Sequence, residues 1–191
     1  MKSFQLLVLV FVSLFASSLY AQSPAAQSAL AQAAQAAAQG DKVSAAKHLQ
    51  TAANTGDAVA QFNLGVAYAS GDGVTASEKK AIDLWQKAAA QGYPPAQYEL
   101  ALYYLNKKQA SKAAPLLKNL ADKGDAAAQY NYAMMLGKGD GVKANPQEAA
   151  RYLSLAAAQG FPPALQATGQ AVGQPAPAAP ATPAGQGRAR K

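Results

Sequence analysis

The sequence predicts an all-α fold, a solenoid of stacked helical hairpins, from two observations. The first is an internal repeat, because the pattern of residues 57–93 returns 68 residues later as residues 125–161. The second is the spacing of apolar residues within each copy, which recur at steps of three and four, as Leu64 and Tyr68 do. That spacing is typical of amphipathic helices. Helical units that repeat along a chain are expected to stack in an array and to share a continuous core.

A glycine followed by Asp or an aromatic residue closes each unit and sets its length. These glycines are separated by 36, 32 and 36 residues and comprise Gly56, Gly92, Gly124 and Gly160. The middle unit is shorter because Tyr104-Leu105-Asn106 runs directly into Lys107-Lys108, where the longer units hold a Gly-Asp-Gly-Val loop. We therefore expect the four missing residues to fall in a loop and both helices of the middle hairpin to remain whole.

Capping residues, glycines and prolines predict where the helices begin and end. Asn145 offers an N-cap before Pro146, with Glu148 at the third helical position, and Gly92 and Gly160 suit left-handed caps after a helix. Double prolines follow both of these glycines and start the next helix. The predicted repeat domain covers 22–172, with hairpins at about 25–55, 57–91, 93–123 and 125–159 and a closing helix at 163–172.

Small residues are expected wherever the two helices of a hairpin touch. The first helices hold Gly65, Ala101 and Ala133, and the second helices hold Ala81, Ala113 and Ala149. Close approach of the helix pair explains this choice, and a bulkier residue at Ala81 or Ala149 should cost about 1–3 kcal/mol through overpacking.

The first 21 residues are typical of a secretory signal. Lys2 is followed by a mostly apolar stretch from Leu6 to Phe15 and by small residues that end at Ala21, after which cleavage is expected. A membrane anchor is the alternative, but the apolar stretch is shorter than the roughly 20 residues that a span needs. The sequence thus predicts a periplasmic or secreted protein.

The final segment, residues 173–191, is rich in Pro and Ala and is expected to be a disordered tail. Its basic end, Arg188-Ala-Arg190-Lys191, could contact anionic lipid or cell-wall polymer or could simply be solvated. The chain has a net charge of +7 and no cysteine. Removal of Lys2 with the signal would leave +6. Scattered charge and expected export both argue against nucleic acid as a partner, and stability must come from packing without disulfides.

The recurring pattern A-x-A-Q-[FY]-N, then G-D-G-V, then A-A-x-Q-G, in residues 57–92 and 125–160, resembles the Sel-one-like repeat family, a relative of the tetratricopeptide repeat. The resemblance extends more weakly over 25–56. It implies a right-handed α-solenoid that binds proteins or peptides on its concave side, and exported bacterial members are associated with envelope or host-interaction roles. The chain departs from the family pattern at Ala101 and Ala133, where glycine is usual, and it has only two long loops.

Counting around the first helix of each hairpin selects the residues that should line the groove. The set contains aromatic, amide and apolar side chains that suit recognition of a peptide, and comprises Phe62, Asn63, Val66, Tyr98, Glu99, Leu102, Tyr130, Asn131 and Met134. The alternative for the three rings is packing between neighbouring repeats. The asparagines are less easily explained as core, because a buried amide needs partners, although they could face water.

The sequence offers no catalytic, metal or cofactor site. Asp72 and Asp140 each provide one carboxylate in a Gly-Asp-Gly loop, which favours a turn over a calcium site that needs several oxygen ligands. His48 is the only histidine and has no cysteine or second histidine to complete a metal site.

Three functions therefore remain for a chain of this kind. The leading hypothesis is an exported interaction module that binds a protein or peptide of the cell envelope. The second is an envelope spacer that contacts cell wall or membrane through its tail. The third is a cell-wall enzyme, which only the expected compartment favours because no acid/base constellation is recognisable.

Overall fold

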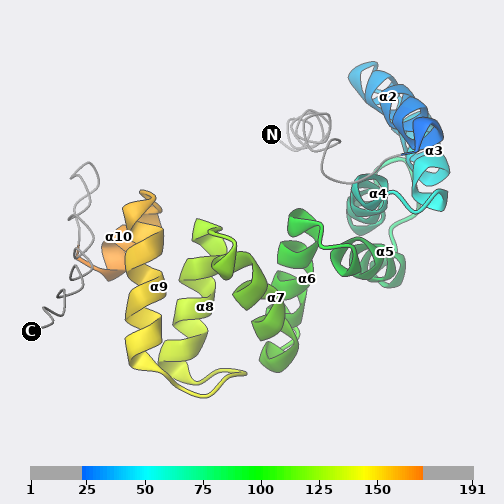
Figure 1. The fold of residues 1–191 in the computed structure, drawn as a ribbon. Coiled ribbons are helices and arrows are strands. Elements are labelled where there is room, and N and C mark those ends of the chain that lie inside the picture. The colour runs from blue at the N-terminus through cyan, green and yellow to red at the C-terminus, as the bar shows by residue number, and fades with distance from the viewer. Residues whose placement is uncertain (1–22, 170–191) are drawn as a thin grey trace, which may run out of the picture. The chain divides into compact units, whose positions relative to one another are not determined.

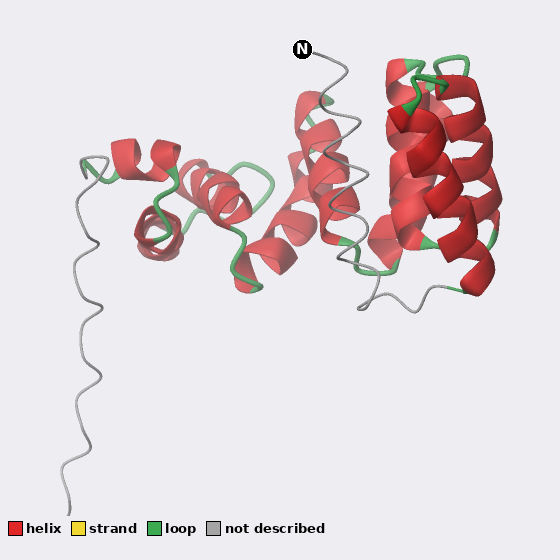
Figure 2. Cartoon of the chain, turned by 90° about the horizontal axis from the view of Figure 1, so that it is seen from above, coloured by secondary structure: helices red, strands yellow, loops and turns green. Residues whose placement is uncertain are grey.

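The computed structural model describes residues 23–169, and within this range every regular element is a helix (Figures 1 and 2). The helices are α2 (Pro24–Ala38), α3 (Lys42–Asn54), α4 (Ala58–Ser70), α5 (Glu78–Ala90), α6 (Pro94–Asn106), α7 (Ala110–Asp122), α8 (Ala126–Lys138), α9 (Pro146–Ala158) and α10 (Pro162–Ala167). The predicted all-α fold of stacked helical hairpins is confirmed. The expected signal at 1–21 and the tail at 173–191 lie outside the described residues.

The chain divides into two compact units, residues 1–120 and 121–191, with the boundary in the last turn of α7. Unit 1 contains α2 to α6 and most of α7, and unit 2 contains the end of α7 with α8, α9 and α10. In unit 2, α8 and α9 run side by side as a hairpin (Figure 1). Across residues 23–169, no helix has both the length and the apolar content needed to cross a bilayer.

Helix starts follow the capping residues of the sequence. Asp57 accepts a hydrogen bond from the backbone N–H of Ala60 at 2.7 Å, and Asp125 does the same for Ala128 at 2.7 Å. The Asn145 side chain accepts from the backbone N–H of Glu148 at 3.1 Å. Each such bond satisfies a donor that the first turn of a helix leaves unpaired.

Helix ends confirm the predicted glycine caps. Gly92 and Gly160 have φ values of 81° and 77°, in the left-handed region that favours glycine. After α5 the N–H of Tyr93 donates to Ala88 O at 3.2 Å, and after α9 the N–H of Phe161 donates to Ala156 O at 3.1 Å. These bonds pair carbonyls that would otherwise remain unsatisfied at the helix end and turn the chain into the next hairpin.

The close approach of the two helices in the first long hairpin has a direct cause at Gly65. A Cβ atom placed there would lie 2.5 Å from Nε1 and 2.6 Å from Cδ1 of Trp85, and 3.2 Å from the carbonyl oxygen of Ala81. The indole of Trp85 therefore occupies the space that a side chain at position 65 would take. The predicted small residues at the helix crossings are buried at Ala81, Ala101, Ala113, Ala133 and Ala149.

Two apolar clusters hold unit 1 together. One joins α4, α5 and α6 through buried residues that include Phe62, Trp85 and Leu100. The other joins α2 and α3 to α4 through small residues around Leu64. Since α4 and α6 contribute to the same cluster, the first helices of neighbouring hairpins are held together in this unit.

In unit 2 the corresponding cluster lies at the end of α9, where Ala156 and Ala157 pack with Ala164 and Leu165 of α10. The closing helix was expected at 163–172, but α10 ends at Ala167. Thr168 caps it and Gly169 then adopts a φ of 71°, a backbone conformation that interrupts a right-handed helix.

The first Gly-Asp-Gly loop packs against the start of α3. Gly73 has a φ of 71°, and a Cβ atom there would lie 1.9 Å from the carbonyl oxygen of Lys42. The carboxylate of Asp72 accepts a hydrogen bond from Lys42 Nζ at 2.7 Å. The loop thus fastens the first long hairpin to the hairpin before it.

Candidate interaction surface

A buried glutamine at the same position of each first helix fixes how that helix is turned. Gln61, Gln97 and Gln129 are 7 %, 5 % and 3 % exposed. Nε2 of Gln97 donates to Ala89 O at 3.2 Å, and Nε2 of Gln129 donates to Ala121 O at 3.2 Å. These two amides therefore tie their first helices to the last turn of the helix before each.

The side-chain oxygen of each of these glutamines accepts a hydrogen bond. The donor is a side chain on the second helix of the same hairpin or on the residue that caps that helix. Nε2 of Gln91 donates to Oε1 of Gln61 at 2.8 Å, and Nε2 of Gln159 donates to Oε1 of Gln129 at 2.9 Å. In the middle unit Nδ2 of Asn119 donates to Oε1 of Gln97 at 2.9 Å. Apolar periodicity does not reveal these residues, because it ignores buried amides. The signal that could have found them is the recurrence of Gln in all three units.

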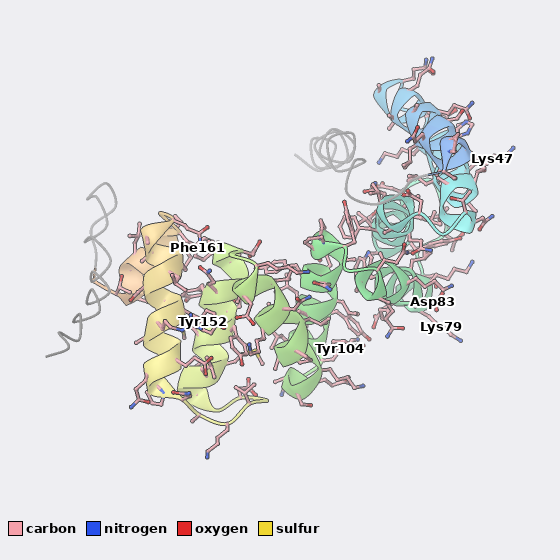
Figure 3. The ribbon with its side chains drawn as sticks, viewed as in Figure 1. Lys47, Lys79, Asp83, Tyr104, Tyr152 and Phe161 are labelled. Carbon is pink, nitrogen blue, oxygen red and sulfur yellow. The ribbon has the colours of Figure 1, made fainter. Side chains whose placement is uncertain are left out.

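The aromatic residues of the predicted groove pack at the ends of the repeats. Phe62 is 3 % exposed and meets Tyr93 edge to face at a centroid distance of 5.5 Å. Tyr130 is half-buried, and its ring centroid lies 5.7 Å from that of Phe161. Phe161 is labelled in Figure 3 and follows the end of α9. Phe62 leaves little surface for a partner, in agreement with the alternative of packing between repeats. Tyr98 is half-buried on α6.

The other predicted groove residues of unit 1 differ in burial. Asn63 is 8 % exposed, and within residues 23–169 its Nδ2 has no hydrogen-bond acceptor. Val66, Glu99 and Leu102 are half-buried. Asn63 and Glu99 occupy equivalent positions of α4 and α6, 36 residues apart, and Val66 and Leu102 do so one turn later. The structure thus brings these four side chains onto the first helices of one unit.

Unit 2 contributes a separate set on α8. Asn131 and Met134 are half-buried there, beside the Tyr130 ring that packs on Phe161. These side chains are accessible in part, so this helix too has surface that a partner can contact.

Glu99 differs from the other carboxylates of unit 1. Burial raises the pKa of its carboxyl above the ordinary value. Within the described range, Glu99 has neither a hydrogen bond nor an ion pair. An ionisable group that is partly desolvated and unpaired is a candidate for a functional site.

A polar cluster links α5 and α6 near the end of the hairpins. The carboxylate of Glu78 accepts from Tyr103 Oη at 3.1 Å and from Lys107 Nζ at 2.8 Å, and these bonds lower the pKa of Glu78. Tyr104, labelled on α6 in Figure 3, accepts from Gln86 at 3.1 Å. These contacts involve side chains that already have partners, so they hold neighbouring hairpins together.

Over the described residues, no three His, Cys, Asp or Glu side chains gather in a way that could hold a metal ion. Lys79 and Asp83 point away from α5 into solvent (Figure 3). Asp83 pairs with Lys87 one helical turn along at 2.8 Å.

Known proteins share both the sequence pattern and the fold. The chain is 30% identical over 148 residues to an exopolysaccharide production negative regulator of Rhizobium leguminosarum bv. viciae, a match that covers 68% of this chain and 55% of that protein. It is 36% identical over 116 residues to chitin synthase regulatory factor 3 of Schizosaccharomyces pombe, covering 57% of this chain and 12% of that one. The chain therefore spans about half or less of these relatives.

Solved structures share the fold of this chain. A Sel1 repeat protein from Oxalobacter formigenes superposes with a TM-score of 0.68 at 26% identity, covering 75% of this chain and 44% of that one. A protective antigen of uropathogenic Escherichia coli strains that displays an SLR fold superposes with a TM-score of 0.62 at 37% identity, covering 65% and 27%.

The Sel1 repeat model matches three consecutive segments, residues 58–93, 94–125 and 126–161, which together make up more than half of the chain. The middle segment is the one with the shortened loop. The chain therefore belongs to the Sel1 repeat family, whose helical-repeat members are generally protein-interaction modules.

Proposed function

We propose that this protein is an exported interaction module whose first helices bind a protein or peptide of the cell envelope. The observation that carries the proposal is the half-buried set on those helices. In unit 1 it includes Val66, Glu99 and Leu102, and in unit 2 it includes Asn131 and Met134. These side chains combine apolar area with polar groups, and buried glutamines fix the helices that carry them.

The relatives support a role in interaction. The names of two of them, from a bacterium and a yeast, describe regulators linked to exopolysaccharide or chitin synthesis. A regulator acts by contacting another component, which agrees with a binding module. Export rests on the apolar stretch after Lys2, and fractionation of cells that express the full chain tests it. Recovery of the protein only with the cytoplasm would contradict export.

The binding face is tested by cross-linking the chain to its partner in intact cells and identifying the captured protein. Leu102→Ala removes apolar contact area from α6 and should reduce capture several-fold. Leu116→Ala is the control, because it truncates another half-buried leucine of the same unit on the second helix α7. Equal loss of capture in the two variants would show that stability, not the first-helix face, is responsible.

A further inference from the structure

We propose that the first-helix face of unit 1 contains an acidic subsite that takes a lysine or arginine side chain from a basic peptide segment of a partner protein. Glu99 on α6 supplies the carboxylate, and Asn63 holds the equivalent position of α4. This inference rests on the proposed function, because it states the chemistry of the partner that the same face binds.

The strongest observation is that Glu99 is the exception among the carboxylates of unit 1. In residues 23–120 there are six Asp and Glu side chains, and the other five each accept a hydrogen bond or form an ion pair inside the protein. Asp41 and Asp57 cap helices, and Asp72, Glu78 and Asp83 bind lysines. A carboxylate that is partly desolvated yet unpaired gains most from a cation that a ligand brings.

The distribution of charge on the unit points the same way. Glu99 is the only Asp, Glu, Lys, Arg or His on α4 or α6. The lysines nearest along the chain lie on the second helices or at the hairpin ends, where Lys87 and Lys107 pair with Asp83 and Glu78. The first-helix face therefore presents a single negative charge, which attracts a basic side chain and repels an acidic one.

Asn63 supplies the second, independent observation. The side chain is more than nine-tenths buried, and its Nδ2 has no acceptor within the described part of the chain. An unsatisfied buried amide costs about 1–3 kcal/mol, and natural proteins pair such groups unless another role retains them.

Half-buried apolar side chains complete the description of the ligand. Val66 and Leu102 lie one helical turn after Asn63 and Glu99 on the same two helices. Leu102, three residues after Glu99 on α6, offers apolar area beside the carboxylate. The partner segment should thus contain a basic residue close to an apolar one.

Selection of a phage-displayed library of random 12-residue peptides against the immobilised full chain tests the inference. The expected result is a consensus with Lys or Arg at one fixed position. The Glu99→Lys variant should select Asp or Glu at that position, because the charge of the subsite is reversed. Asp83→Lys, which reverses a charge on the second helix α5, is the matched control and should leave the consensus unchanged.

A synthetic peptide with the selected consensus then measures the contribution of the Glu99 carboxylate. Its affinity, read by fluorescence anisotropy, should fall about tenfold for Glu99→Gln, as expected for a lost charge-assisted hydrogen bond. Circular dichroism confirms that each variant is folded.

The possible outcomes separate the two proposals. One outcome is that the selected peptides bind the first-helix face yet share no basic residue. That result overturns the acidic subsite and leaves the proposed function standing. Failure to enrich any peptide overturns both. Tight binding of a synthetic peptide of residues 173–191 would identify the basic end of this chain as the occupant and contradict a separate partner.

Discussion

The two long repeats, residues 57–93 in unit 1 and 125–161 in unit 2, share their ends and differ where their helices cross. Both have the glycine cap, a hydrogen bond between two glutamine side chains and an aromatic pair at the repeat end. At the crossing, the first repeat has Gly65 against Trp85, and the last has Ala133 and Leu153 at the equivalent positions. The repeats thus preserve the space between two helices, not the residues that fill it.

The largest expected effect on stability comes from replacing Gly65 and Trp85, which meet at the helix crossing of the first repeat, by the Ala and Leu of the last repeat. Trp85→Leu alone should lower the free energy of unfolding by about 3 kcal/mol, because it leaves a cavity. Gly65→Ala alone should cost about 1–2 kcal/mol, since the new Cβ overlaps the indole. Urea denaturation of both single variants and of the double variant gives the coupling energy.

In the double variant the smaller Leu side chain makes room for the added methyl group. The loss should therefore be smaller than the sum of the two single losses by about 1–2 kcal/mol. Strict additivity would show that the loss at position 65 does not depend on the indole and that the two positions do not share one space.

The next test concerns the buried glutamine that all three repeats have at the same position of the first helix. Gln97→Leu removes one of the two donors to Ala89 O, which keeps its bond from Gly92 N–H, and the acceptor for the half-buried Asn119 amide. We expect a loss of about 2 kcal/mol in the free energy of unfolding. Gln86→Leu is the control, because that side chain is exposed and should change stability by about 0.5 kcal/mol or less.

Sequence predicted the fold and the helix ends because both depend on local chemistry. Gly92, Asn145 and Pro146 act through the backbone next to them, so their roles can be read without a neighbour in space. Repeat spacing likewise predicts which positions of α4 and α6 are equivalent. Asn63 and Glu99 are 36 residues apart, one repeat length, and that spacing alone is enough to place them at equivalent positions of the two helices.

The roles of individual site residues depend on contacts that spacing does not reveal. Phe62 is covered by Tyr93, which comes from the junction with the following repeat. The burial of Gln61 depends on Gln91, 30 residues away. That Glu99 lacks a partner is evident only when every neighbouring helix is in place. That the predicted groove residues contact a partner stays a prediction in both units.

The shared glycine caps allow a smaller test of whether the two repeats are equivalent. Gly92→Ala and Gly160→Ala each place a Cβ in open space, so the only cost is that of a positive φ. Each should lower the free energy of unfolding by about 1 kcal/mol, and the two losses should agree. Thermal unfolding of the two variants checks this. A much larger loss for one of them would show that its cap also supports a contact that the other lacks.

The smallest expected effect separates Glu99 from the residues that only hold the repeats together. Burial raises the pKa of its carboxyl in the folded protein above that in the unfolded chain. At neutral pH, where the unfolded chain is ionised, the native state therefore loses stability by holding this charge. As the pH falls through the folded and then the unfolded pKa, both states become protonated and that loss disappears.

Glu99→Gln should accordingly raise the melting temperature slightly at pH 7 and give no gain at pH 3, because a side chain that reaches solvent is strongly screened. Asp83→Asn removes an exposed carboxylate that pairs with Lys87 and should give no gain at pH 7. A variant that folds better and binds basic peptides less well is the behaviour expected of a residue retained for binding. A loss of stability at pH 7 would instead show that the Glu99 carboxylate supports the fold, as the other five carboxylates of the unit do.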